Sequence, residues 1–207
     1  VKRKLPMKES ISNKFNHFKV HTQYSICEGA IKIDQLKDFC KKNKIRSVGM
    51  SDTYNLSGAL EFSENLFSVG TQPIIGTQIL FKYKDFFGTI PLIAKDNVGY
   101  KNIIELSSKS YLDNTDISNP HCKFEDLLNK STGIIVLSGS IKCLIGNLFN
   151  KGLFDEINDI ISKISKNFKD NFYLEIQRHN DLNEKEFENF NLNISKKFDL
   201  PIIATHE

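Results

Sequence analysis

Apolar residues recur along the chain with two periods, which alternate from one segment to the next. Alternating or short wholly apolar runs predict strands, whereas spacings of three and four residues predict helices. The predicted strands are residues 16–21, 45–50, 73–81, 89–95, 133–137, 172–177 and 201–205. The predicted helices are residues 33–44, 57–66, 97–112, 124–128, 141–149, 153–164 and 184–198. This alternation favours an α/β domain with a parallel sheet, either a β/α barrel or a doubly wound sheet.

The composition is that of an ordinary globular chain. Its 207 residues suffice for one sizeable domain, and 40% hydrophobic and 26% charged residues are typical of soluble proteins. No apolar run is long enough for a membrane helix, so we expect no membrane partner. The net charge of +3 allows contact with nucleic acid without indicating it, because the lysines are spread among acidic residues.

Cysteine usage and the N-terminal segment favour a cytoplasmic protein. Cys27, Cys40, Cys122 and Cys143 form no CxxC pair, which excludes a zinc ribbon and a thioredoxin-like motif. We expect reduced thiols that pack as small apolar groups. Disulfides would require an oxidising compartment, and residues 1–14 lack the apolar core of a secretory signal. We expect residues 1–14 to be a flexible basic leader, followed by one domain.

Polar residues follow most of the predicted strands. The carboxyl ends of parallel strands meet on one side of a sheet, so these side chains are expected to form one rim. His21, Asp52 and Glu207 are candidate ligands for a divalent metal that would activate water, with Glu28 and His206 as lesser candidates. Three ligands on three loops could form one loose site but no cluster of several metals. Two simpler interpretations stay open: a hydrogen-bonded structural role for His21, and a helix cap at Asp52.

An ordered series of motifs resembles the PHP domains found at the N-terminus of bacterial DNA polymerase III alpha subunits. The motifs are HFKVHTQYS at 17–25, EG at 28–29, SDTYNLSG at 51–58, QPIIG at 72–76, AKDNVGYKN at 94–102, LSG at 137–139, YLEIQRH at 173–179 and LPIIAT at 200–205. The resemblance implies a distorted (β/α)7 barrel, the PHP fold, over residues 15–207. It also implies that the domain is truncated at its C-terminus, with the polymerase palm, fingers and thumb absent.

Departures from the family pattern fall at its metal-binding positions. The family has His where this chain has Lys19, Thr53 and Thr89, Glu where it has Gln78, and Cys where it has Ser140. The resemblance therefore implies a degenerate metal site and no catalytic residue in this chain. The vestigial rim that it implies consists of Lys19, His21, Glu28, Asp52, Thr53, Gln78, Thr89, Ser140, His179, His206 and Glu207.

Lys19 is the departure with the clearest physical consequence. Its ammonium group would lie where a metal ion is expected, and a protonated amine has no lone pair to offer as a ligand. We hypothesise that Lys19 pairs with Asp52 or Glu207, which would convert the metal site into a network of ion pairs. Glu207 itself stands where the family has Asp.

The resemblance implies a role in chromosomal replication. The parent protein would be a DNA-directed DNA polymerase, a nucleotidyltransferase that binds DNA and uses Mg²⁺. This domain would be a non-catalytic scaffold without a cofactor, joined to the remainder of the alpha subunit and docking partners such as the proofreading exonuclease subunit. The alternative is an active metal-dependent phosphoesterase or 3′–5′ exonuclease with Zn²⁺ or Mn²⁺. A free-standing small-molecule phosphatase, related to histidinol phosphatases, is a third possibility.

Overall fold

A computed structural model describes residues 15–114 and 119–206. Its sheet has seven strands in the order β1-β2-β3-β5-β6-β7, with β4 paired to β2. The strands are β1 (Ser47–Thr53), β2 (Gln72–Tyr83), β3 (Phe86–Ala94), β4 (Cys122–Lys123), β5 (Ile134–Leu137), β6 (Phe172–Ile176) and β7 (Ile202–Ala204). The helices are α1 (Ile33–Asn43), α2 (Ala59–Ser68), α3 (Asn97–Leu112), α4 (Phe124–Asn129), α5 (Leu144–Asn150), α6 (Phe154–Phe168) and α7 (Glu184–Phe198).

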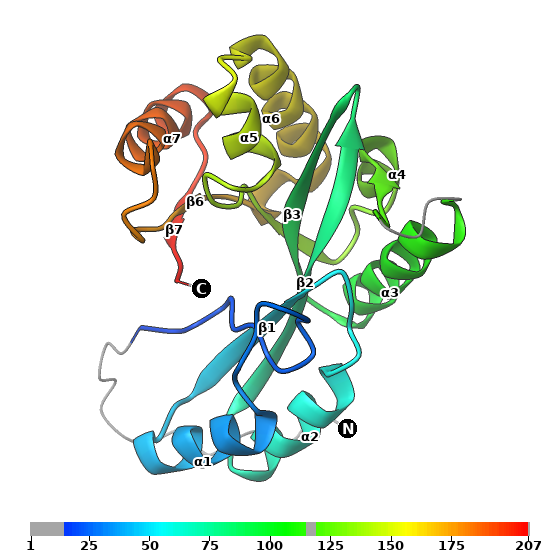
Figure 1. The fold of residues 1–207 in the computed structure, drawn as a ribbon, viewed down its shortest axis with the longest axis vertical. Coiled ribbons are helices and arrows are strands. Elements are labelled where there is room, and N and C mark those ends of the chain that lie inside the picture. The colour runs from blue at the N-terminus through cyan, green and yellow to red at the C-terminus, as the bar shows by residue number, and fades with distance from the viewer. Residues whose placement is uncertain (1–14, 115–118, 207) are drawn as a thin grey trace.

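The sheet is curled and open on one side, which gives the molecule the form of a half-barrel (Figure 1). Strands β2 and β3 run through the middle of the molecule. Helices α1 and α2 lie at one end beside β1, and helices α5, α6 and α7 lie at the other end near β6 and β7. This curled α/β architecture confirms the predicted fold class.

Strand β3 departs from the parallel sheet that the alternation predicted. It runs antiparallel to both β2 and β5, whereas the pairs β1–β2, β5–β6 and β6–β7 are parallel. Tyr83 pairs with Phe86, so only Lys84 and Asp85 connect β2 to β3, and Lys84 has a φ of 52°. A connection this short forms a hairpin, because a parallel crossover needs a dozen or more residues.

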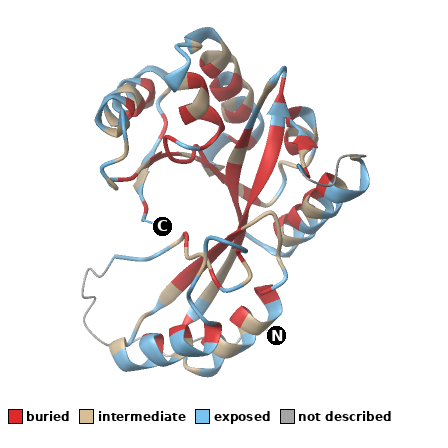
Figure 2. Cartoon of the chain, viewed as in Figure 1, coloured by how far each residue is buried: buried red, intermediate tan, exposed pale blue. Residues whose placement is uncertain are grey.

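Buried apolar side chains form two separate clusters. The smaller joins α1, α2 and β1, with Met50, Phe62 and Leu66 fully buried. The larger contains β3, β5, β6 and the remaining helices, and the isoleucine stripe of α6 packs into it. Figure 2 shows the buried residues gathered along the sheet, with exposed residues on the outer faces of the helices. The long strand β2 contributes side chains to both clusters, so it connects the two ends of the molecule.

Two local predictions differ from the structure. Residues 16–21 form no regular strand; Val20 and Thr22 make only isolated bridges, to Met50 and Ile31. Asp52 lies inside β1 rather than beyond its end, since β1 continues to Thr53. The predicted leader, residues 1–14, lies outside the described residues. No helix in the described part of the chain is long and apolar enough to span a membrane.

Candidate functional site

A pocket of about 680 Å³ opens between the N-terminal segment and the strands of the sheet. Its walls come from the loop before α1, the end of β1, the middle of β2 and of β3, the loop before α5 and the segment after β7. Most of the residues that the sequence assigned to the rim are brought together here. They are Lys19, His21, Glu28, Thr53, Gln78, Thr89, Ser140 and His206.

Lys19 is the most deeply buried of these rim residues. The segment around it is held against β1, because the backbone N–H of Val20 donates to the Gly49 carbonyl at 3.0 Å. Only 1% of Lys19 is exposed, and its Nζ lies 3.0 Å from Oε1 of Glu175 in β6. The structure thus pairs Lys19 with Glu175. The prediction of Asp52 as its partner is wrong, and the other predicted partner, Glu207, lies outside the described residues.

Glu175 is a site residue that the sequence reasoning missed. Its Oε1 accepts hydrogen bonds from Gln177 Nε2 at 2.6 Å and from the Thr205 hydroxyl. Its backbone N–H donates to the Ser138 hydroxyl at 2.8 Å. The available signal was an acidic residue inside an otherwise apolar strand, where a buried charge needs a partner.

Asp52 fastens the N-terminal segment to β1 and is fully buried. The backbone N–H and the hydroxyl of Thr22 both donate to its carboxylate oxygens at 2.6 Å. Burial raises the pKa of Asp52, an effect that the two Thr22 hydrogen bonds partly oppose. The predicted helix cap is not formed, since Asp52 lies within a strand. Both oxygens of this candidate ligand are committed to Thr22.

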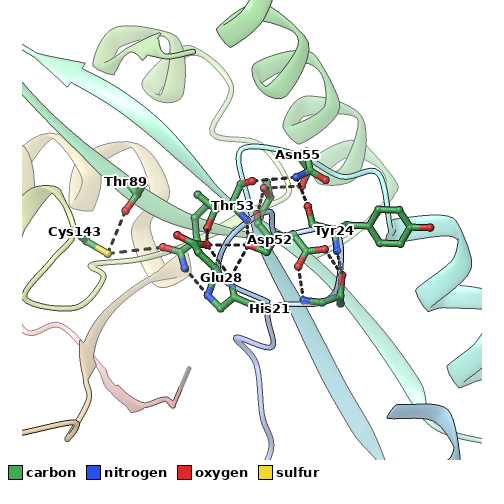
Figure 3. Close-up of polar contacts among 12 residues, drawn as sticks. His21, Tyr24, Glu28, Asp52, Thr53, Asn55, Thr89 and Cys143 are labelled. Carbon is green, nitrogen blue, oxygen red and sulfur yellow. Dashed lines mark hydrogen bonds and ion pairs between the residues drawn. The ribbon is translucent and has the colours of Figure 1, made fainter. Parts of the chain in front are cut away.

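His21 lies in a chain of polar contacts that includes Glu28 (Figure 3). Its Nδ1 is 3.1 Å from Ser25 Oγ and 3.5 Å from Glu28 Oε2, and its Nε2 is 3.2 Å from Gln78 Nε2. The Gln78 side-chain amide thus faces Nε2 of the ring, and a hydroxyl and a carboxylate face Nδ1. Glu28 Oε2 also accepts from the Thr53 hydroxyl at 2.5 Å. The structural interpretation of His21 therefore accounts for both ring nitrogens.

Cys143 brings a thiol to the same rim, where the family pattern had pointed to Ser140. The Thr89 hydroxyl lies 3.4 Å from Cys143 Sγ, and Ser140 Oγ lies 3.6 Å from it (Figure 3 shows the Thr89 contact). The thiol also donates to Gln78 Oε1 at 3.9 Å. The sequence treated Cys143 as a small apolar group, which its burial supports. Its position three residues after Ser140, in a loop that follows a strand, was the signal for a place on the rim.

The last predicted rim residues lie near the ends of β6 and β7. The rings of His179 and His206 are 4.5 Å apart between centroids. His206 lines the pocket and His179 does not. The backbone N–H of His179 donates to the Glu184 carboxylate at 2.9 Å, so this residue helps to order the turn before α7.

The side chains in the described pocket do not fit a centre of several metal ions. No group of three or more His, Cys, Asp or Glu side chains in residues 15–114 and 119–206 is placed to hold a metal. Asp52 is occupied by Thr22, His21 by Gln78 and Ser25, and Lys19 adds a positive charge. Neutral threonine hydroxyls stand at two further positions, and a hydroxyl is a poor replacement for imidazole as a ligand of a transition metal.

Comparison with known proteins places this geometry in a family. Residues 17–179 match the family described as PHP domain. The chain is 33% identical to DNA polymerase III subunit alpha of Caulobacter vibrioides, over 97% of this chain and 18% of that protein. It is 31% identical to the subunit of the same name from Vibrio cholerae, over 94% of this chain and 17% of that protein. The chain thus spans less than a fifth of the length of these relatives.

Solved structures agree on the fold. A protein from Bifidobacterium adolescentis, named as a candidate metal-dependent phosphoesterase, superposes with a TM-score of 0.59 at 14% identity, covering 92% of this chain and 86% of that one. An amidohydrolase from Chromobacterium violaceum gives a TM-score of 0.56 at 8% identity, covering 93% of this chain and 86% of that one. Since the family match extends over most of the described residues, the chain belongs to the PHP domain family.

Proposed function

We propose that this PHP domain is a non-catalytic scaffold within a DNA polymerase III alpha subunit, with a degenerate metal site. The observation that carries the proposal is the buried ion pair between Lys19 and Glu175 at 3.0 Å. It places the Lys19 amine in the wall of the pocket. We infer that this amine replaces the metal ion of a working site.

Electrostatic repulsion is the reason that Lys19 disfavours a metal. Lys19 and His21 are two residues apart and line the same pocket. Two like unit charges 4 Å apart repel by about 4 kcal/mol at an effective dielectric constant of about 20, and a divalent ion about doubles this cost. His17, His21, Glu28 and His206 all line the pocket, but no three such side chains in the described residues converge to offset that cost.

The wider role is inferred from the named relatives. We propose that the parent protein is a DNA-directed DNA polymerase that acts in the cytoplasm on DNA, with Mg²⁺ bound outside this chain. In that setting the domain supports the rest of the alpha subunit and docks a separate proofreading exonuclease subunit. The length of the relatives supports a division of labour, because more than four fifths of each lies outside the matched region.

One observation favours a second candidate function, an active metal-dependent phosphoesterase or 3′–5′ exonuclease. The fold is shared with a protein named as a candidate phosphoesterase, and His21, Glu28 and Cys143 still lie on one pocket. Zn²⁺ or Mn²⁺ would be its cofactor. A free-standing small-molecule phosphatase has less support, because the curated relatives are polymerase subunits.

A nuclease and phosphatase assay separates the two functions. The purified chain is incubated with 3′-labelled single-stranded DNA and with a generic phosphomonoester, in the presence of Mn²⁺ or Zn²⁺. His21→Ala is the matched control, because it removes the imidazole that contacts Ser25, Glu28 and Gln78 in the pocket. The scaffold proposal predicts equal background rates for both proteins. Metal-dependent turnover that is lost in His21→Ala would establish the enzyme instead.

A further inference from the structure

Three buried oxygen atoms near β6 lack hydrogen-bond donors among the described residues. They are Oε2 of Glu175, Oε1 of Gln177 and Oδ1 of Asn191. The three residues are 1%, 6% and 0% exposed, respectively. Buried acceptors are nearly always paired, and leaving one without a donor costs stability. Three in one place indicate that something else binds them.

The hydrogen bonds made by the two amide nitrogens show which side-chain atoms are left without a partner. Gln177 Nε2 donates to Glu175 Oε1 at 2.6 Å and to Thr205 Oγ1 at 3.0 Å. Asn191 Nδ2 donates to the Glu175 backbone carbonyl at 3.1 Å. Turning either amide around would direct an oxygen at another acceptor, so the assigned orientations hold. Each amide nitrogen therefore contacts Glu175, and each amide oxygen is left without a hydrogen-bond donor among the described residues.

The same three residues line one small cavity between β6 and α7. Its volume is about 10 Å³, which is the space of a single water molecule or a small ion. Ser140, Glu184 and Glu188 complete its polar wall. The cavity shares Ser140 with the larger pocket, but Lys19 and His21 do not line it.

We propose that this cavity is a binding site for a monovalent cation, bound by one carboxylate and two amide oxygens. A water molecule has two protons and would leave one of the three acceptors without a donor. A cation satisfies all three at once, and oxygen ligands are those preferred by hard cations. The site goes beyond the scaffold function, and neither requires the other.

The charges around the cavity favour a single positive charge. Its walls include three carboxylates, from Glu175, Glu184 and Glu188. Two of these have a cationic partner: Lys19 lies against Glu175 and Arg178 lies against Glu188. One negative charge is left over, which a monovalent ion neutralises. A divalent ion would leave the site with an excess positive charge. It would also be repelled by the Lys19 ammonium, which lies against the other oxygen of the Glu175 carboxylate.

Anomalous diffraction provides the direct test. Crystals of the 207-residue chain are soaked in a thallium(I) salt, since Tl⁺ replaces K⁺ and scatters anomalously. The proposal predicts an anomalous peak in contact with Glu175, Gln177 and Asn191. A map without a peak at this position, with a water oxygen in its place, overturns the proposal.

Thermal unfolding provides a second readout in solution. The melting temperature is compared in KCl, in NaCl and in N-methyl-D-glucamine chloride at one ionic strength. We expect a rise of about 2–4 °C in one or both alkali salts, because a ligand that binds only the folded state stabilises it. Equal melting temperatures in all three salts contradict a bound alkali ion.

A pair of variants ties that salt effect to the cavity. Asn191→Leu removes one ligand oxygen together with one side-chain hydrogen bond. Asn102→Leu is the matched control, because Asn102 Nδ2 also donates to a backbone carbonyl, that of Thr132 at 2.8 Å, away from the cavity. We expect the salt effect to disappear in Asn191→Leu and to persist in Asn102→Leu. Persistence in both variants rules out this location.

Discussion

The Lys19 amine forms a buried ion pair with the Glu175 carboxylate. The Lys19 side chain is fully buried, and so is the Glu175 side chain 3.0 Å away. Removing one partner from such a pair leaves the other charge uncompensated. We therefore expect Lys19→Met to lower the free energy of unfolding by about 3–5 kcal/mol, measured by urea denaturation.

The control for this variant is an exposed lysine with an acidic partner. Lys142 lies 2.8 Å from Asp181 and its side chain is 73% exposed, so Lys142→Met is expected to change stability little. Adding Glu175→Leu to Lys19→Met should recover much of the loss, because an apolar pair can replace a buried ion pair. If Lys19→Met is no more harmful than Lys142→Met, the ion pair is not formed as described.

Because Asp52 is buried, we expect the free energy of unfolding to depend on pH with the opposite sign to that caused by a salt-bridged carboxylate. Burial raises its pKa above the ordinary value of 3.8, so the folded state holds this proton more tightly than the unfolded state. The resulting stabilisation is fully present below pH 3.8 and is lost as pH rises through the raised pKa of the folded state.

Subtracting the stability of Asp52→Asn isolates this effect. The difference between wild type and variant, measured by urea denaturation from pH 3 to pH 7, should shift against the wild type as pH rises. Thr22 can still donate its backbone N–H to an amide oxygen, so the variant is expected to fold. A difference that moves in favour of the wild type with rising pH would mean that Asp52 is stabilised as a carboxylate.

Secondary structure elements with strong local signals were predictable from the sequence. The bounds of α3 and α7 agree with the predicted residues 97–112 and 184–198. For α3 the start is fixed locally, because the Asp96 side chain accepts from the Gly99 N–H at 2.9 Å. The direction of β3 was missed, since it depends on the two-residue connection at Lys84 rather than on apolar periodicity.

The candidate site was predictable only in part, for a different physical reason. Motifs at strand ends located most of the rim, because the ends of the strands meet wherever the chain folds as an α/β sheet. The partner of Lys19 was missed because Glu175 is far away in the sequence, and no local pattern reports such a contact. The place of residues 16–22 was also missed, since it depends on the hydrogen bonds of Thr22 with Asp52.

Helix α3 packs against the start of β5 through a close approach of two glycines. A methyl group on Gly99 would come within 1.7 Å of the Gly133 carbonyl oxygen, and Gly133 itself has a φ of +72°. Gly99→Ala must push α3 away from the sheet, so we expect a loss of about 1–3 kcal/mol, measured as a lower midpoint of urea unfolding. Val98→Ala, at the neighbouring 51% exposed position, is the control and should change stability far less.

At the scale of the whole molecule, the Lys19–Glu175 pair connects the two ends of the half-barrel. Lys19 belongs to the segment bound to β1, next to the smaller apolar cluster, and Glu175 belongs to β6 at the larger one. The two ends are otherwise joined chiefly through β2 and β3, as Figure 1 shows. A fixed internal cation in this position suits a scaffold, because it needs no exchangeable metal to hold the ends together.

Calorimetric titration of Zn²⁺ and of Mn²⁺ into the metal-free chain measures the consequence of that internal cation. If the Lys19 ammonium has replaced the metal centre, neither ion will bind tightly with a stoichiometry of two or more per chain. Stoichiometric, tight binding of two or more ions that is lost in His21→Ala would show that the pocket is still a working metal centre.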